Sequence, residues 1–285
     1  MKIFFSCLGK IVFFGALFAV VTRDQGFQLC YEGVDVEISA GVAPTFWIDR
    51  DDFCAVSCNA STLALVASPY VPLFKMPGFN KLFTVPWYLG LHVGYALCED
   101  QEIYAELNYR QSKSRTYTLS SLVIPNIDTI SFAMTPKNNY RIVDAYIGLR
   151  SYCQSSWCDD IALFLGGKIG LVHHAKTNFI FSTASLTIPP PTPFISSTLP
   201  LFLSNTVPAI GANIGLTYEV GCDFSCVITA EFILSCGPRA NPNIPFDFLL
   251  QSIFINPILA PNSFIIGQIG TEIAVPLTIG FKYQF

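Results

Sequence analysis

Alternation of apolar and polar side chains is the dominant pattern along this chain. In the C-terminal segment every second residue is apolar: Val275, Leu277, Ile279, Phe281, Tyr283 and Phe285. The positions between them hold Pro276, Thr278, Gly280, Lys282 and Gln284. A period of two puts the two sets on opposite faces of an extended strand, whereas a helix would scatter the apolar groups around its axis. The segment therefore predicts a strand with one apolar face.

The same alternation recurs in other segments, which are 33–45, 87–97, 103–110, 142–151, 160–172, 207–220 and 227–235. Together they predict about eight strands with lipid on one face. Short connections at 98–101, 153–160 and 221–226 alternate with long ones at 49–86, 112–139, 174–206 and 237–272. This arrangement is what an up-and-down barrel needs when both termini lie at the end with the short turns. The predicted fold is thus all-β, an up-and-down antiparallel transmembrane β-barrel with long loops on one end.

The composition also points toward lipid. Hydrophobic residues make up 52 % of the chain, charged residues only 13 %, and the mean hydropathy is +0.48. In hydrocarbon only helices and closed barrels satisfy the backbone. The stretch 177–218, which carries no charge, and the similarly apolar stretch 244–271 could be read as helical spans of a polytopic membrane protein. Their several prolines, and the lack of an unbroken apolar run long enough to span, favour the barrel.

The N-terminus has the pattern of an export signal. Lys2 and Lys10 supply positive charge, an apolar stretch runs over 11–21, and polar residues follow it. We expect a signal peptide over approximately 1–26 and the barrel over 27–285. The alternative is a single anchoring helix, but the stretch is short for a span.

The chain resembles the small outer-membrane barrels: the opacity-protein, OmpX and OmpW type, and the transmembrane part of OmpA. The resemblance covers residues 30–285 and is carried by the final strand with Phe281, Tyr283 and Phe285 and by the segments 90–95 and 146–150. It implies a location in the bacterial outer membrane, with the lipid of that membrane as a partner. It also implies that the three terminal aromatic residues are the signal read by the barrel-assembly machinery.

Several inward positions of the expected strands are charged. The predicted polar network of the lumen consists of Glu37, Glu106, Arg110, Asp144, Arg150, Lys168, Glu219, Glu231 and Lys282, with Asp35 beside it. Unpaired buried charges are costly, so the mixed signs favour an ion-paired plug. The alternative interpretation of the same residues is a narrow or gated path for solutes.

The chain has ten cysteines, and nine remain (10 − 1) once Cys7 leaves with the signal. An exported chain meets an oxidising compartment, and the odd number leaves at least one cysteine free or bonded between chains. Candidates for local disulfides are Cys54 with Cys58, Cys153 with Cys158 and Cys222 with Cys226. Free thiols are the alternative. The cysteine content resembles that of the disulfide-linked envelope proteins of chlamydia-like bacteria, which implies disulfide-linked envelope proteins or a host surface as partners.

The remaining chemistry is sparse. His173 and His174 are expected near the outer rim, but no His-x-Ser sequence occurs and no acidic residue adjoins them. As adjacent strand residues they should point to opposite faces, which argues against a metal pair. The sequence thus predicts no catalytic residue, no metal and no cofactor. No basic run occurs, so nucleic acid is not an expected partner.

Aromatic residues near the expected strand ends or on the outward faces are interpreted as anchors at the membrane interface. They are Trp47, Trp87, Tyr95, Tyr109, Tyr218 and Tyr283. Long apolar loops favour a structural or surface-interaction role, since exposed apolar patches often mark interaction sites. The alternatives are a narrow channel or porin for small solutes and, less favoured by the residues, a lipid-modifying barrel enzyme.

Overall fold

The computed structural model describes residues 33–50, 52–56, 70–75, 77–98, 100–124, 128–154, 161–185, 193–221, 223–241, 263–266 and 269–285. The expected signal peptide lies outside these ranges, as do Cys58, Cys158 and Cys222. In the described part of the chain, no helix has the length and apolar character needed to cross a bilayer.

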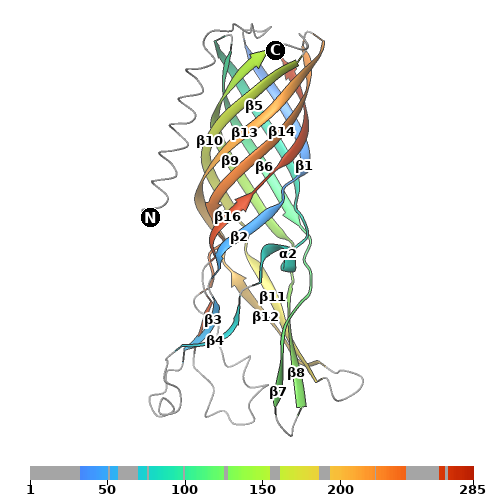
Figure 1. Ribbon diagram of the computed structural model, residues 1–285, viewed down its shortest axis with the longest axis vertical. Coiled ribbons are helices and arrows are strands. Elements are labelled where there is room, and N and C mark those ends of the chain that lie inside the picture. Colours follow the sequence, from blue (N-terminus) through green and yellow to red (C-terminus); the bar gives the residue numbers. More distant parts are fainter. Residues whose placement is uncertain are drawn as a thin grey trace.

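Eight antiparallel strands close into a barrel (Figure 1). They are β1 (Val34–Val42), β5 (Trp87–Cys98), β6 (Gln101–Ser112), β9 (Tyr140–Gln154), β10 (Ile161–His174), β13 (Asn205–Gly221), β14 (Phe224–Cys236) and β17 (Leu277–Gln284). The first strand pairs with the last, with Val36 opposite Tyr283, so no edge remains in the ring. The predicted antiparallel barrel of about eight strands is confirmed.

Two wall strands are interrupted by proline and then continue. β1 resumes after Ala43 and Pro44 as β2 (Thr45–Arg50), and β16 (Ile269–Ala274) precedes β17 across Val275 and Pro276. Proline lacks the N–H that a ladder uses, so it is suited to such breaks. The neighbouring N–H groups are still satisfied: Ala43 N donates to Pro86 O at 2.9 Å and Val275 N to Pro44 O at 2.8 Å.

The long connections expected from the sequence contain strands of their own. A four-stranded sheet holds β7 (Tyr117–Ile124), β8 (Asp128–Pro136), β11 (Thr177–Ser185) and β12 (Pro193–Phe202), and a three-stranded sheet holds β3 (Asp52–Val56), β4 (Tyr70–Lys75) and β15 (Ser263–Ile266). Both sheets lie beyond the end of the barrel opposite the C-terminus (Figure 1). We call this end the hairpin end, and the end with the C-terminus and short connections the turn end.

Side chains on the two faces of the wall have opposite exposure. On β9 Ile147 is 63 % exposed, whereas its neighbour Tyr146 is 3 % exposed. Trp87, Tyr95, Tyr218 and Tyr283 lie exposed on the outer face, where interfacial aromatics were expected.

Trp47 is a correction to that expectation, because it is only 5 % exposed and lies inside. The strand continues past Pro44 with unchanged parity, so Trp47 shares the inward face of Glu37 and Thr45. It packs against Phe79, which belongs to the short helix α2 (Phe79–Leu82), with ring centroids 5.1 Å apart.

Candidate functional site: the charged and aromatic interior

The interior nearest the turn end is built around Lys282 of β17. Its ammonium nitrogen lies 2.8 Å from Asp35 Oδ2 on β1 and 2.7 Å from Glu102 Oε2 on β6. Tyr152 OH donates to the same Glu102 oxygen at 2.6 Å. Arg150 donates to Glu37 Oε2 at 3.0 Å. These side chains meet because each occupies an inward position of a wall strand, and their charges compensate one another in a water-poor space.

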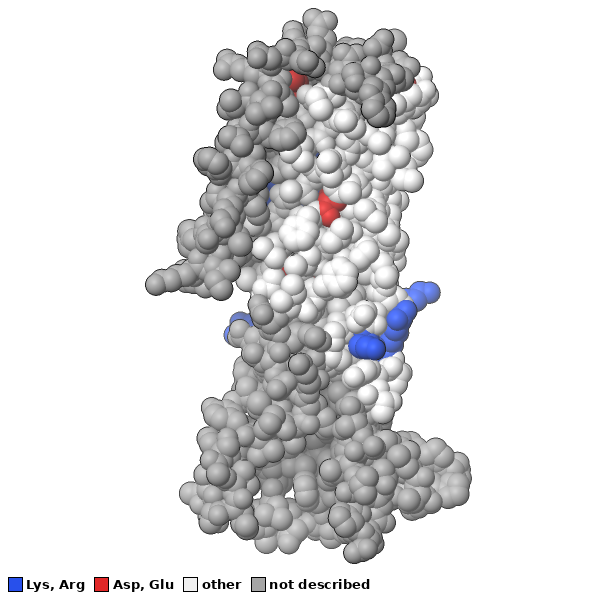
Figure 2. Space-filling view, viewed as in Figure 1, with Lys and Arg blue, Asp and Glu red and all other residues white. Residues whose placement is uncertain are grey.

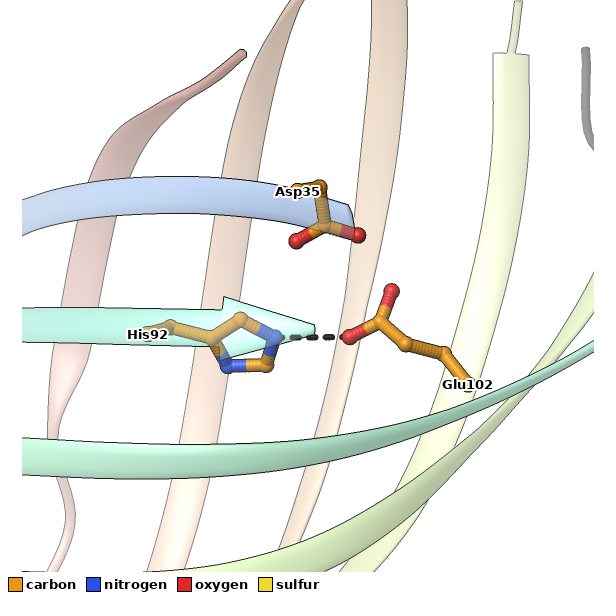
Figure 3. Close-up of side chains that lie close together, drawn as sticks. All are labelled: Asp35, His92 and Glu102. Carbon is orange, nitrogen blue, oxygen red and sulfur yellow. Dashed lines mark hydrogen bonds and ion pairs between the residues drawn. The ribbon is translucent and has the colours of Figure 1, made fainter. Parts of the chain in front are cut away.

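Asp35, His92 and Glu102 come close enough together to hold a metal ion (Figure 3). Figure 3 shows the His92 ring and the Glu102 carboxylate pointing at one another, with His92 Nε2 2.6 Å from Glu102 Oε1. An imidazole nitrogen and two carboxylates would suit zinc by donor type. The Lys282 ammonium already contacts both carboxylates, however, so a divalent cation would have to displace it. Asp35, His92 and Glu102 therefore form an ion-pair cluster with Lys282.

Glycine makes this cluster sterically feasible. A Cβ atom on Gly94 would lie 2.7 Å from both Asp35 carboxylate oxygens and 2.7 Å from Glu102 Cδ. Contacts this short are not tolerated, so a side chain at this position would push the carboxylates away from Lys282. Gly94 of β5 therefore helps to position the charges.

The middle of the interior is organised by Lys168 of β10. Its ammonium nitrogen lies 2.8 Å from Glu106 Oε2 and 2.8 Å from Glu231 Oε2. The other oxygen of Glu106 accepts hydrogen bonds from Tyr88 OH at 2.8 Å and from Asn108 Nδ2 at 2.6 Å. One cation thus holds two carboxylates, and neutral donors satisfy the remaining lone pairs of Glu106.

A third cluster lies toward the hairpin end. Arg110 binds Asp144 with two nitrogens, Nε at 2.8 Å and Nη2 at 3.2 Å, a planar fork geometry that guanidinium favours. Its Nη1 lies 3.4 Å from Glu272 Oε1. The other Glu272 oxygen accepts hydrogen bonds from Trp47 Nε1 at 3.1 Å and Tyr140 OH at 2.9 Å.

Beyond this third cluster the interior becomes aromatic. The buried aromatic members are Trp47, Phe79, Phe83, Tyr140, Phe179 and Phe202, joined by Leu82, Met134 and Leu201. Trp47 lies edge-on to Phe202 at 5.5 Å between centroids, and Phe202 to Phe179 at 5.5 Å, a geometry that aromatic pairs prefer. We call these nine residues the aromatic plug. The plug packs apolar side chains across the hairpin end of the barrel.

The structure brings most of the predicted lumen residues together. Buried and paired are Glu37, Glu106, Arg110, Asp144, Arg150, Lys168, Glu231 and Lys282. Glu219 is half-buried near the turn end of β13. Sequence reasoning missed Glu102 and Glu272. In both strands the inward residues have even numbers. Starting the predicted strand 103–110 one residue earlier would have found Glu102, and extending the last strand from Thr278 back to residue 272 would have found Glu272.

The candidate disulfide cysteines are only partly described. Cys153 and Cys226 are free thiols, and so is the exposed Cys236. Both Cys153 and Cys226 lie on the outward parity of their strands, with Cys153 opposite Leu163 and Cys226 opposite Phe281. The prediction of disulfides that close these turns is not confirmed.

The two adjacent histidines lie on opposite sides of the wall. His174 is buried, with Nδ1 2.9 Å from Tyr140 OH. His173 is exposed on the outer face, where its Nε2 lies 3.1 Å from Ser204 Oγ and its Nδ1 2.9 Å from Thr206 Oγ1. The two partners of the His173 ring are therefore the hydroxyls of Ser204 and Thr206. No carboxylate among the described residues contacts this ring.

A closed antiparallel barrel with an apolar outer face and a charged, paired interior satisfies its backbone in hydrocarbon. Among the described residues, the exposed charges lie at the two ends of the wall. The chain is therefore an eight-strand antiparallel β-barrel of the transmembrane type.

No protein-family model matches the sequence, and comparison with curated proteins finds no significant match. Among solved structures, Neisserial surface protein A is 10 % identical with a TM-score of 0.40, over 89 % of this chain and 97 % of that one. The attachment invasion locus protein Ail of Yersinia pestis, in complex with a heparin analogue, is 11 % identical with a TM-score of 0.34, over 88 % and 99 %. OprG of Pseudomonas aeruginosa is 11 % identical with a TM-score of 0.38, over 92 % and 100 %. At these scores the likenesses carry no argument about function.

Proposed function

We propose that this chain is a sealed outer-membrane barrel that holds its outer β-hairpins at the cell surface for contact with other surfaces. The observation that carries the proposal is the filled interior: Lys282, Lys168 and Arg110 each hold two carboxylates, and the aromatic plug follows them. An eight-strand barrel is only wide enough for side chains. Opening a path would require breaking several buried ion pairs at once.

The hairpins are suited to contact because they extend the wall outward as strands. β7 with β8 and β11 with β12 form one sheet beyond the barrel. Two further partners are part of the proposal: the lipid of the outer membrane along the apolar wall, and the barrel-assembly machinery at Phe281, Tyr283 and Phe285. Host surfaces and disulfide-linked envelope proteins are the proposed targets of the hairpins.

Deletion of residues 183–200 tests the contact role. Cells that display the full chain should adhere to host-cell monolayers, and the deletion should abolish adhesion while heat-modifiable gel migration shows a folded barrel. A Gly–Ser replacement of residues 155–160, which connect β9 to β10 in the sequence, serves as the control and should adhere normally. Unchanged adhesion of a folded deletion variant would refute the role.

A narrow channel is the competing function, and planar-bilayer recording separates the two. The purified full chain should give no conductance steps, because its charges are paired across the lumen. The alternative requires steps in the unmodified protein that change when Glu106→Ala or Lys168→Ala alters the central cluster. Such steps would replace the sealed barrel with a channel.

A lipid-modifying enzyme is a second alternative, favoured only by the hydrogen bond between Ser204 and His173. Serine hydrolases usually orient the histidine with a carboxylate or amide, and here the orienting group is the Thr206 hydroxyl. We expect outer-membrane lipid to remain unmodified in cells that express the chain. Release of fatty acid that is lost in both Ser204→Ala and His173→Ala would establish the enzyme instead.

A further inference from the structure

Exposed positive charge gathers at one level of the molecule. Every exposed Lys or Arg among the described residues lies at the hairpin end, where the wall meets the outer sheets: Lys81, Lys113, Arg115, Lys137, Arg141, Lys176 and Arg239. We call these seven residues the basic arc. On the face shown in Figure 2 the wall is mostly white, and the prominent blue side chains stand at its lower end. At the turn end the partly or fully exposed charges that the structure describes are acidic: Asp100, Glu219 and Asp223.

The arc continues the lipid-facing surface of the wall. Lys113 follows Tyr109 and Gln111 on the outward parity of β6, and Arg141 precedes Val143, which is exposed on the outer face of β9. Tyr109 and Trp87 form an outward aromatic pair with ring centroids 5.2 Å apart. Such aromatic residues mark the headgroup level of a bilayer. Arg141 lies opposite Gln111, which pairs with Trp87, so the arc begins at the level of this aromatic pair and Lys113 lies two residues beyond it.

Several members of the arc are neighbours on adjacent strands. Arg141 lies opposite Gln111 in the β6–β9 register, which sets it beside Lys113. The Arg141 carbonyl accepts a hydrogen bond from Ala175 N at 3.0 Å, so the next residue, Lys176, is close to Arg141. Lys137 N donates to Asn178 O at 2.7 Å on β11, the strand paired with β8 in the outer sheet. Four cations thus lie at or beside three neighbouring connections between the wall and the outer strands, 113–116, 137–139 and 175–176. They are Lys113, Lys137, Arg141 and Lys176.

None of the seven side chains forms an ion pair with a carboxylate of the described residues. Like charges on neighbouring strands destabilise a sheet. The described interior of the same barrel pairs each of its Lys and Arg residues with a carboxylate. The arc differs, because its cations have no such partner among the described residues. An external anion at this level would relieve the repulsion.

We propose that the basic arc binds the phosphate groups of lipid headgroups in the leaflet that surrounds the hairpin end. Arg and Lys suit phosphate, Arg as a planar fork and Lys as a compact charge. The position of Arg141 and Lys113 favours a lipid over a soluble polyanion, because the two residues flank the outer face of the wall at and just beyond the level of Trp87. A soluble ligand would more readily reach the far ends of the hairpins.

The test uses the full chain folded in detergent and titrated with bis-phosphorylated lipid A or with the same lipid after removal of both phosphates. We expect binding that needs the phosphates and weakens with salt. Replacing Lys113, Arg141 and Lys176 together by Gln should weaken binding roughly a hundredfold, since each basic residue at an anionic surface contributes about a fivefold gain in affinity. Heat-modifiable migration checks that the variant is folded.

Two controls make the result specific. The charge-conserving variant Lys113→Arg, Arg141→Lys, Lys176→Arg should retain most of the affinity, and Asp223→Asn at the turn end should bind as the unmodified chain does. Equal affinity for the dephosphorylated lipid, or full affinity in the folded Gln variant, would overturn the proposal. Inorganic pyrophosphate or heparin that binds the arc as tightly as the lipid would overturn it as well, and would assign the arc to a soluble anion.

Discussion

Lys168 illustrates how single residues determine the interior of this barrel. It is 3 % exposed and lies within 2.8 Å of both Glu106 and Glu231. Its ammonium also lies 4.5 Å from the centroid of the Tyr146 ring, a position where the ring face attracts a cation. Without this cation the two carboxylates would face one another in a space with little water.

Lys168→Met should therefore destabilise the barrel by about 3–5 kcal/mol, the usual result of removing one partner from a buried ion pair. Equilibrium unfolding by urea in detergent micelles measures this change. The exposed Lys176→Met serves as the matched control and should change stability little. Adding Glu106→Gln and Glu231→Gln to Lys168→Met should restore most of the loss, because no uncompensated charge then remains. Equal stability of Lys168→Met and Lys176→Met would contradict the role of the central cluster.

The sequence predicts which side chains face inward but not which of them pair. Alternation alone assigns Glu106, Lys168 and Glu231 to the interior. Their contact depends on the stagger of the strands around the ring, since these residues lie on β6, β10 and β14, and no local pattern encodes that stagger. The aromatic plug was missed for a similar reason. Its members come from α2 and the adjoining Phe83, from β2, β8, β11 and β12, and from the first residue of β9. Most of them lie in regions that the sequence analysis assigned to connections.

At the scale of elements, the strands that the sequence predicts have charged residues or glycines on their inward face. The strands that it misses lack this pattern. β17 alternates Thr278, Gly280 and Lys282 with apolar residues and is predicted over its full length. β12 reads PFISSTLPLF, with no charge on either face. Strands outside the bilayer do not need one lipid face and one polar face, so their alternation is weak.

The terminal strand supports a prediction at this scale. Phe285 is 75 % exposed at the end of the chain, so it contributes little packing to the folded barrel. Phe285→Asp should strongly reduce the amount of folded protein in the outer membrane of expressing cells, because recognition by the assembly machinery is lost. Refolding of the same variant from urea into detergent should proceed as for the unmodified chain. A variant that inserts normally in cells would remove Phe281, Tyr283 and Phe285 from the proposed assembly signal.

At the scale of the whole molecule, links between chains depend on free thiols that are exposed on the outer surface. Cys236 is exposed at the hairpin end of β14, and Cys153 and Cys226 lie half-buried near the turn end. Non-reducing gels of native envelopes should show higher-mass species that reductant dissolves, and Cys236→Ser should diminish them. Identical migration with and without reductant would argue against links between chains.

Four outer strands pass into the wall with only short breaks, at 113–116, 137–139, 175–176 and 203–204. Ladder hydrogen bonds run perpendicular to the strands, so a pull along the hairpins is resisted by many of these bonds in shear rather than by one after another. A load applied at the tips would pass directly to the embedded cylinder, whose interlocked charges resist flattening. The hairpins and the wall thus form one mechanically continuous unit, so that the surface contact proposed for the hairpins would transmit tension to the barrel.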